Sequence, residues 1–134
     1  VNPSLPDANF PSLIKNALRN NPDYIVVAEA RGEEMMDALL SAMSGHPIIM
    51  TIHAKDVVSL PERMARLAML TSDKLVKEEI LKDVLHHFHY YVYLEKSETT
   101  AGILRHIQDV DVYQEKEKKM EEIKYGTRII GWCC

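Results

Sequence analysis

Two side chains with catalytic chemistry follow two apolar runs in the first half of the chain. Glu29 follows the run 24–28, and His53 follows the run 48–52. In open α/β sheets, ligands bind beyond the carboxyl ends of the strands, where both residues are predicted to lie. A carboxylate there can hold the water shell of Mg²⁺ or orient a reacting water, and an imidazole can hydrogen-bond a phosphate. The spacing leaves a second interpretation open, in which Glu29 caps the next helix and His53 makes a turn hydrogen bond.

Helices alternate with these strands and position them. Apolar residues recur at helical spacing over residues 11–20, and the turn signal 21–23 ends that helix and begins the strand 24–28. The strand is apolar throughout, which predicts burial on both faces, as in a parallel sheet. A second helix opens at residues 33–34, where negative charge suits the helix dipole, and Gly45 is placed to end it.

The chain continues as helices and then as strands. Ser59 and Glu62 match a capping box, which predicts a third helix from Ser59 to about residue 70. From residue 86 the hydrophobic period changes to two, which indicates an antiparallel β-rich part. The further predicted elements are a helix over 72–85, strands within 86–95, 101–113 and 124–134, and a charged loop or hairpin end over 114–122. The predicted fold class is therefore α/β, with parallel strands first and an antiparallel β-rich C-terminal part.

Composition narrows the class of protein. The 134 residues suffice for one domain with a core, and a net charge of −4 favours neither nucleic acid nor an anionic membrane as a direct partner. No apolar run approaches the ~18 residues that cross a bilayer, and no secretory signal is visible. Cys133 and Cys134 are adjacent, so they frame neither a disulfide scaffold nor a zinc site. His87 and His89 are predicted on one face of a strand at a spacing metals can use, but no third ligand is near.

Several motifs within residues 10–70 resemble a known family, in the same order and at similar spacing. They are Leu18-Arg19, Pro22-Asp23, the apolar run 25–27, Ala28-Glu29, Arg31, Ser44-Gly45-His46, Thr51-Ile52-His53 and the segment 63–67. Together they resemble the secretion or traffic ATPases, the P-loop motors of type II and type IV secretion, type IV pili and tight-adherence pili. Arg31-Gly32 and Ala54 are similar to the branch that serves type IV secretion and tight-adherence pili. In the tail, Arg105 matches a basic residue of the family's closing hairpin.

The resemblance implies a partial RecA-like P-loop NTPase domain, in which 24–28 is the Walker B strand. Glu29 would be the catalytic glutamate, which polarises the attacking water and helps to hold Mg²⁺ through water. His53 would belong to the histidine box, which senses the γ-phosphate, in a reaction where positioning and charge stabilisation supply most of the catalysis. Ala28 stands where the family has glycine, which is tolerated if the backbone there avoids positive φ.

The family's phosphate-binding loop is missing from this sequence. A P-loop requires G-x-x-x-x-G-K-[ST], because its N–H groups wrap the phosphates and its lysine neutralises them. Only Gly126 and Gly131 have that spacing, and Trp132 follows where lysine is required. In the family the loop lies upstream of the Walker B strand. We therefore expect residues 1–134 to be a single-domain fragment of a larger protein, the C-terminal half of an ATPase motor domain. Its Walker B and histidine-box part would be 10–70, and its helix and β-hairpin tail 72–134.

The resemblance also implies cofactors, partners and location. The full-length protein would bind ATP with Mg²⁺, whereas this fragment would bind no cofactor and be inactive alone. It would form a homohexamer with nucleotide at subunit contacts, and inner-membrane platform proteins of a secretion or pilus system would be its partners. It would be a cytoplasmic protein that associates peripherally, through its partners, with the inner face of the cytoplasmic membrane. For the fragment we expect a monomer or a non-physiological dimer that covers an exposed apolar edge.

The resemblance offers further candidates for contacts to nucleotide or between subunits. They are Arg31, His46, Arg19 and Arg66. Arg31, two residues past Glu29, could pair with it or reach nucleotide across a subunit boundary, and the alternative is a salt bridge to a neighbouring acid such as Glu33 or Glu34. The other two arginines also fit solvated helix residues, and His46 also fits a local structural role.

Two other functions compete with the ATPase. The first is a non-catalytic interaction or regulatory module derived from such an ATPase, which would have no need for Glu29 and His53 together. The second is a small independent hydrolase that uses these two residues, for which the sequence offers no plausible nucleophile.

Overall fold

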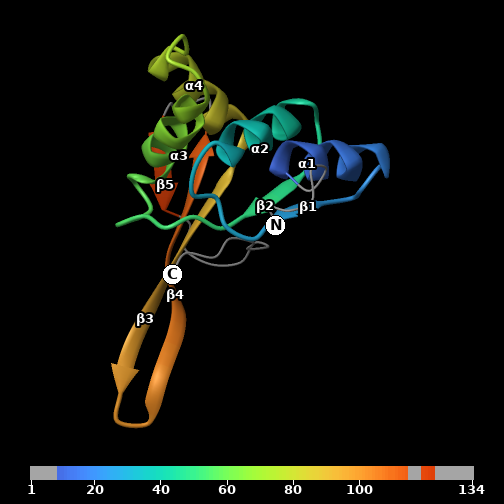
Figure 1. Ribbon diagram of the computed structural model, residues 1–134. Helices are drawn as coiled ribbons and strands as arrows, with labels where there is room; N and C mark the ends of the chain where they lie inside the picture. Colours follow the sequence, from blue (N-terminus) through green and yellow to red (C-terminus); the bar gives the residue numbers. More distant parts are fainter. Residues whose placement is uncertain (1–8, 115–118, 123–134) are drawn as a thin grey trace.

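The chain folds into an α/β body from which a long β-hairpin extends (Figure 1). The computed structural model describes residues 9–114 and 119–122. The elements are α1 (Phe10–Arg19), β1 (Ile25–Val27), α2 (Glu34–Met43), β2 (Ile48–Met50), α3 (Leu60–Ala68), the 3₁₀ turn η1 (Met69–Thr71), α4 (Lys77–His87), β3 (Tyr90–Thr99), β4 (Gly102–Gln114) and β5 (Lys119–Glu122). The predicted α/β fold with a parallel and an antiparallel part is confirmed.

The two short strands form a parallel pair, as predicted. Ile25 lies opposite Ile48, and Val27 lies opposite Met50. One face of the pair packs against α1 and α2 in a cluster that includes Ile25, Val27 and Ala38. On the other face, Val26 is 68% exposed, because α1 and α2 cover only one side among the described residues. The prediction of a strand buried on both faces is therefore wrong for this part of the chain.

Local signals set the ends of α1 and α2. The side chain of Asn9 accepts a hydrogen bond of 2.9 Å from the backbone N–H of Ser12, and Pro11 occupies the first turn of α1. After α2, Gly45 adopts φ +88°, a left-handed conformation that glycine reaches at little cost. α2 connects the end of β1 to the start of β2, so the two strands run in the same direction.

The main core joins α2, α3, α4 and β3. Its largest fully buried side chains are Met35, Leu39, Met64 and Val84. The predicted capping box does not form, since Ser59 makes no side-chain cap. Instead the backbone N–H of Ser59 donates to Asp56 Oδ1 at 2.7 Å. Glu62 instead lies 3.0 Å from Arg66 Nη2 and 2.5 Å from Lys77 Nζ, which joins α3 to α4.

The fourth helix begins later than predicted. The stretch 72–76 is not helical, because the hydroxyl of Ser72 accepts from the N–H of Lys74 at 3.2 Å and the carbonyl of Ser72 accepts from the N–H of Leu75 at 3.4 Å. Such local bonds compete with helix formation. The helix ends at His87, and His89 precedes β3, so the prediction that both histidines share a strand face is wrong.

The C-terminal part is an antiparallel sheet in the order β3-β4-β5. β3 pairs with β4 from Tyr90–Val112 to Thr99–Gly102, which makes the long hairpin of Figure 1. The predicted charged loop 114–122 is wrong in part, because residues 119–122 pair with β4. The strand predicted over 124–134 lies outside the described residues. Among those that the structure describes, no helix is long and apolar enough to cross a membrane.

Candidate functional site

The loops that follow β1 and β2 continue the pairing of the strands. The N–H of Thr51 donates to the carbonyl of Val27 at 3.2 Å, and the N–H of Ala30 donates to the carbonyl of Thr51 at 2.9 Å. The hydroxyl of Thr51 also donates to the carbonyl of Ala28. These bonds hold the two loops side by side beyond the strand ends, so the residues that follow must face each other.

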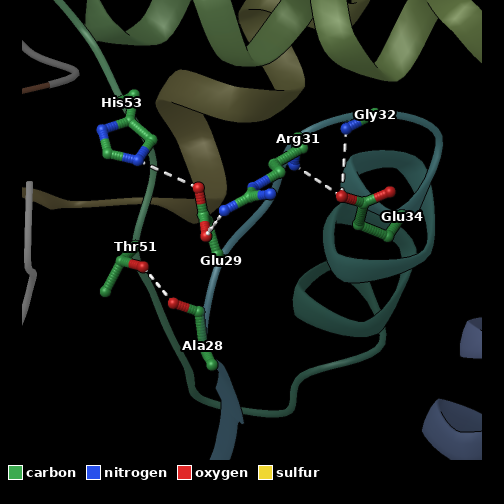
Figure 2. A network of polar contacts seen from close by, with 7 residues as sticks. All are labelled: Ala28, Glu29, Arg31, Gly32, Glu34, Thr51 and His53. Carbon is green, nitrogen blue, oxygen red and sulfur yellow. Dashed lines mark hydrogen bonds and ion pairs between the residues drawn. The ribbon is translucent and has the colours of Figure 1, made fainter. Parts of the chain in front are cut away.

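Glu29 lies between a guanidinium and an imidazole (Figure 2). Arg31 Nη2 donates to Glu29 Oε2 at 2.5 Å, and His53 Nε2 lies 2.9 Å from Glu29 Oε1. The Glu29 side chain is 28% exposed, while the other two side chains lie more in solvent. The expected meeting of Glu29 and His53 at one edge of the sheet is confirmed, and Arg31 pairs with Glu29 rather than with Glu33 or Glu34.

The electrostatics keep Glu29 ionised. The hydrogen bond from Arg31 holds the pKa of the Glu29 carboxyl below its ordinary value; burial opposes this shift, and the charges of Arg31 and His53 add to it. The same contact raises the pKa of Arg31. At neutral pH the site therefore presents a carboxylate, the form that can accept a proton.

The two oxygens of Glu29 differ in their surroundings. Oε2 receives the hydrogen bond from Arg31. Oε1 is shielded from solvent and makes no hydrogen bond of ordinary geometry with the described residues. His53 Nε2 approaches this oxygen at 2.9 Å. A buried carboxylate oxygen in this condition is suited to one more polar partner, such as a water molecule or a hydrated cation.

Ala28 does not strain the backbone before Glu29. Among the described residues, Asn21 is the only non-glycine with positive φ. The methyl group of Ala28, where the resemblance predicts glycine, is thus compatible with the conformation observed at this position.

Glu34 completes the network, and sequence reasoning missed its role. Its Oε1 atom accepts hydrogen bonds from the backbone N–H of Arg31 at 2.5 Å and of Gly32 at 3.0 Å (Figure 2). Burial opposes ionisation of Glu34, yet these backbone bonds lower its pKa overall. The available signal was a carboxylate three residues after Arg31 at a helix start, a spacing similar to that of capping side chains.

A basic hollow opens beside His53. It has a volume of about 420 Å³ and is lined by His53, Ala54, Lys55, Ser59, Glu62, Arg63 and Arg66. Arg66 is thereby placed next to the site, although its guanidinium pairs with Glu62. Three permanent cations against one carboxylate favour an anionic occupant near His53.

Two of the sequence-predicted candidates lie elsewhere. Arg19 is the last residue of α1 and precedes the start of β1. It therefore lies toward the edge of the strand pair opposite to Glu29, which follows the end of β1. His46 also precedes its strand, with Nδ1 3.3 Å from the Ser44 hydroxyl. It lines a separate hollow with Tyr24 and His89. The structure therefore separates Arg19 and His46 from Glu29, and both would need contacts outside this site to take part in nucleotide binding.

The sequence similarity to known proteins includes the segments that carry Glu29 and His53. The sequence profile of the family described as "Type II/IV secretion system protein" matches residues 5–87. The chain is 39% identical to the type IV pilus ATPase PilU of Pseudomonas aeruginosa over 57 residues. This alignment covers 42% of this chain and 15% of PilU.

Solved structures resemble a larger share of the chain. The VirB11 ATPase of the Brucella suis type IV secretion system aligns with a TM-score of 0.68 at 29% identity, over 78% of this chain and 32% of that one. The ATPase DotB of Legionella pneumophila aligns with a TM-score of 0.62 at 27% identity, over 83% of this chain and 29% of DotB. The chain thus spans at most 32% of the length of these relatives.

Proposed function

We propose that this chain, which belongs to the type II/IV secretion system ATPase family, supplies one side of the ATP-hydrolysing site of a secretion or pilus motor. In this proposal the domain is the RecA-like C-terminal half of the motor, with β1 as its Walker B strand. The observation that carries it is the ionised carboxylate of Glu29, held between Arg31 and His53 where β1 and β2 end. Ligands of open α/β sheets bind at this edge.

Glu29 is the catalytic carboxylate in this mechanism. Its Oε2 atom is held by Arg31, so Oε1 is the oxygen that orients the attacking water and accepts its proton. The water oxygen forms a bond to the γ-phosphorus as the bond to the β–γ bridging oxygen breaks, which yields ADP and phosphate. Arg31 keeps the carboxylate in one orientation before the reaction, which reduces the reorganisation that the reaction requires.

His53 and the hollow beside it act on the phosphate side of the site. The imidazole adjoins both Glu29 Oε1 and the basic hollow, so it is placed to contact a γ-phosphate oxygen while it stays near the carboxylate. The buried oxygen of Glu29 also suits a water of a hydrated Mg²⁺. When bound, Mg²⁺ neutralises charge on the phosphate oxygens. The P-loop that binds most of the triphosphate comes from sequence outside this chain.

The decisive variant is Glu29→Gln in the complete protein. The amide keeps the shape of the side chain but cannot accept the proton, so hydrolysis falls about 100-fold or more while ATP binding stays largely intact. Glu33→Gln is the matched control, because Glu33 is an exposed carboxylate four residues away without a side-chain cap bond. Phosphate release and nucleotide affinity are measured side by side, and full turnover in Glu29→Gln would overturn the proposal. His53→Ala lowers turnover with a smaller effect on binding.

The 134-residue chain alone is expected to bind no Mg²⁺–ATP at micromolar concentration, because the backbone donors and lysine of a P-loop supply most of that affinity. Calorimetric titration with a parallel phosphate-release assay tests this. Micromolar binding, or turnover that Glu29→Gln removes, would mean that these residues contain a complete site and that the half-motor interpretation is wrong.

Assembly follows from the same proposal. The complete protein forms a homohexamer that works with inner-membrane platform proteins from the cytoplasmic side. Within the part of the chain that the structure describes, the outer face of β1 is uncovered and Val26 is exposed, so the chain alone is a monomer or a dimer that buries this face. Light scattering measures the mass directly, and a stable hexamer of the 134-residue chain would contradict this expectation.

A further inference from the structure

The carboxylate of Glu34 points backward from the first turn of α2 to the loop that carries Arg31. Its Oε1 atom accepts from two successive backbone N–H groups, those of Arg31 and Gly32. The N–H of Met35 closes the same turn on the carbonyl of Gly32 at 3.1 Å. Figure 2 shows Glu34 on α2 with its carboxylate aimed at this loop. A single carboxylate oxygen of Glu34 thus binds two backbone N–H groups of the loop that precedes α2.

This turn carries the guanidinium that contacts Glu29. Arg31 is only two residues from Glu29; its side chain donates to the Glu29 carboxylate, and its backbone N–H donates to Glu34 on α2. On the other side, the N–H of Ala30 is tied to the carbonyl of Thr51. The segment that carries Glu29 is therefore anchored at Ala30 to the loop after β2, and at Arg31 and Gly32 to α2.

We propose that Glu34 is the positioning residue of this site: its carboxylate holds the main chain of Arg31, and the side chain of Arg31 in turn holds Glu29. The catalytic meaning of this role rests on the proposed function, whereas the positioning itself is independent of it. Glu34 touches neither nucleotide nor water in this scheme. It acts only through Arg31.

The chain contains a matched control for this role. Glu33 precedes Glu34, carries the same side chain and lies at the same helix end, but makes no side-chain cap bond. An effect of charge near the helix N-terminus would be shared by both glutamates. An effect that belongs to Glu34 alone must come from its two hydrogen bonds to the loop.

The first test needs no nucleotide and uses amide hydrogen exchange of the 134-residue chain by NMR. In Glu34→Ala, exchange at Arg31 and Gly32 is expected to rise about tenfold, the factor expected when a charge-assisted hydrogen bond is lost. The Arg31 guanidinium signals are expected to change with it. Glu33→Ala leaves both unchanged, and Glu34→Gln, which keeps a carbonyl acceptor, restores part of the protection.

Exchange at Ala38 and Leu39, deep in α2, reports whether the helix itself has opened. If it opens in Glu34→Ala, the same comparison is made in Glu34→Gln, where the smaller change keeps the helix. Unchanged exchange at Arg31 and Gly32 in the folded variants, or equal changes in Glu33→Ala, overturns the proposal.

The second test measures ATP turnover of the complete protein in a double-mutant cycle. Because Glu34 acts through Arg31, the double variant Arg31→Ala with Glu34→Ala is expected to be no slower than Arg31→Ala alone. Full additivity of the two losses overturns the positioning role. If instead the complete protein shows no hydrolysis that depends on Glu29, the proposed function fails, and the exchange experiment still decides whether Glu34 holds the loop.

Discussion

Two regions of the molecule handle their polar and apolar groups in opposite ways. In the strand-end site (Glu29, Arg31, Glu34, Thr51 and His53), each side chain has a hydrogen-bond or ion-pair partner within the site or its loops. The distal arm, residues 94–107 of the β3–β4 hairpin, projects away from the body (Figure 1). Its residues Ile103, Leu104 and Ile107 are 54%, 52% and 44% exposed.

The arm also places like charges together. Lys96 lies directly opposite Arg105 in the strand register. Neither makes an ion pair with another residue that the structure describes, and like charges at opposed positions destabilise a hairpin. Among the residues that the structure describes, β5 pairs with β4 over Asp111–Gln114, at the base of the hairpin and not along its arm. A two-stranded ribbon of this kind is marginally stable by itself.

The difference shows where this chain determines its own geometry. The site lies on loops, yet pairing beyond the strand ends and one helix carboxylate orient its side chains. The arm has regular strands, yet packing fixes little of it. Regular secondary structure and the number of side-chain partners therefore differ between the two regions, and local stability is expected to follow the partners.

Core truncation should separate the two regions most strongly. Leu39 is fully buried in α2, the helix that carries Glu34, so Leu39→Ala is expected to lower the free energy of unfolding by about 2–5 kcal/mol. Leu104→Ala removes the same atoms from the arm and should change it by about 0.5 kcal/mol or less. Urea unfolding measures both, and similar losses would mean that the arm is packed as tightly as the body.

The sequence predicted the parts of the site that depend on chain direction and spacing. Apolar runs followed by Glu29 and His53 were enough to place both residues at one sheet edge, because parallel strands present their carboxyl ends together. The family motifs added Arg31. The structure separates His46 and Arg19 from that edge because each precedes its strand, a consequence of topology that motif matching ignores.

What the sequence missed depended on competition between local partners. Ser59 had the spacing of a capping residue, but Asp56 binds its backbone N–H, and Glu62 is drawn to Lys77 on another helix. A helix was predicted to begin at Ser72, but the hydroxyl and the carbonyl of Ser72 accept hydrogen bonds in a turn instead. Which partner prevails depends on distances that only the folded chain sets.

A smaller effect should follow from the ion pairs that join α3 to α4. The hydrogen bonds from Lys77 and then from Arg66 lower the pKa of Glu62 from its ordinary value of 4.5. Because the pKa of Glu62 is lower in the folded state, its ion pairs add to the free energy of unfolding above pH 4.5. This contribution is lost as the pH falls through the folded-state pKa. Glu62→Gln should therefore melt slightly earlier than wild type at pH 7, and the difference should close in acid.

Melting curves between pH 7 and pH 3 test this expectation. Glu95→Gln is the control from the arm, because its carboxylate lies 3.5 Å from His106 on an exposed ribbon and joins no second helix. A melting difference for Glu62→Gln that stayed constant into acid would show that lost shape, not lost charge, explains it.

The smallest effect tests the arm itself. Lys96→Glu replaces a repulsion with an ion pair to Arg105 and should stabilise the hairpin by about 0.2–1 kcal/mol. Lys96→Gln removes the repulsion without adding attraction, so the stability of its hairpin should lie between those of the wild type and Lys96→Glu. Amide exchange across the hairpin measures the gain, which salt should reduce because both side chains are exposed. If Lys96→Glu loosened the arm, Lys96 and Arg105 would have to be held apart by other contacts, and the contrast with the strand-end site would lose its electrostatic basis.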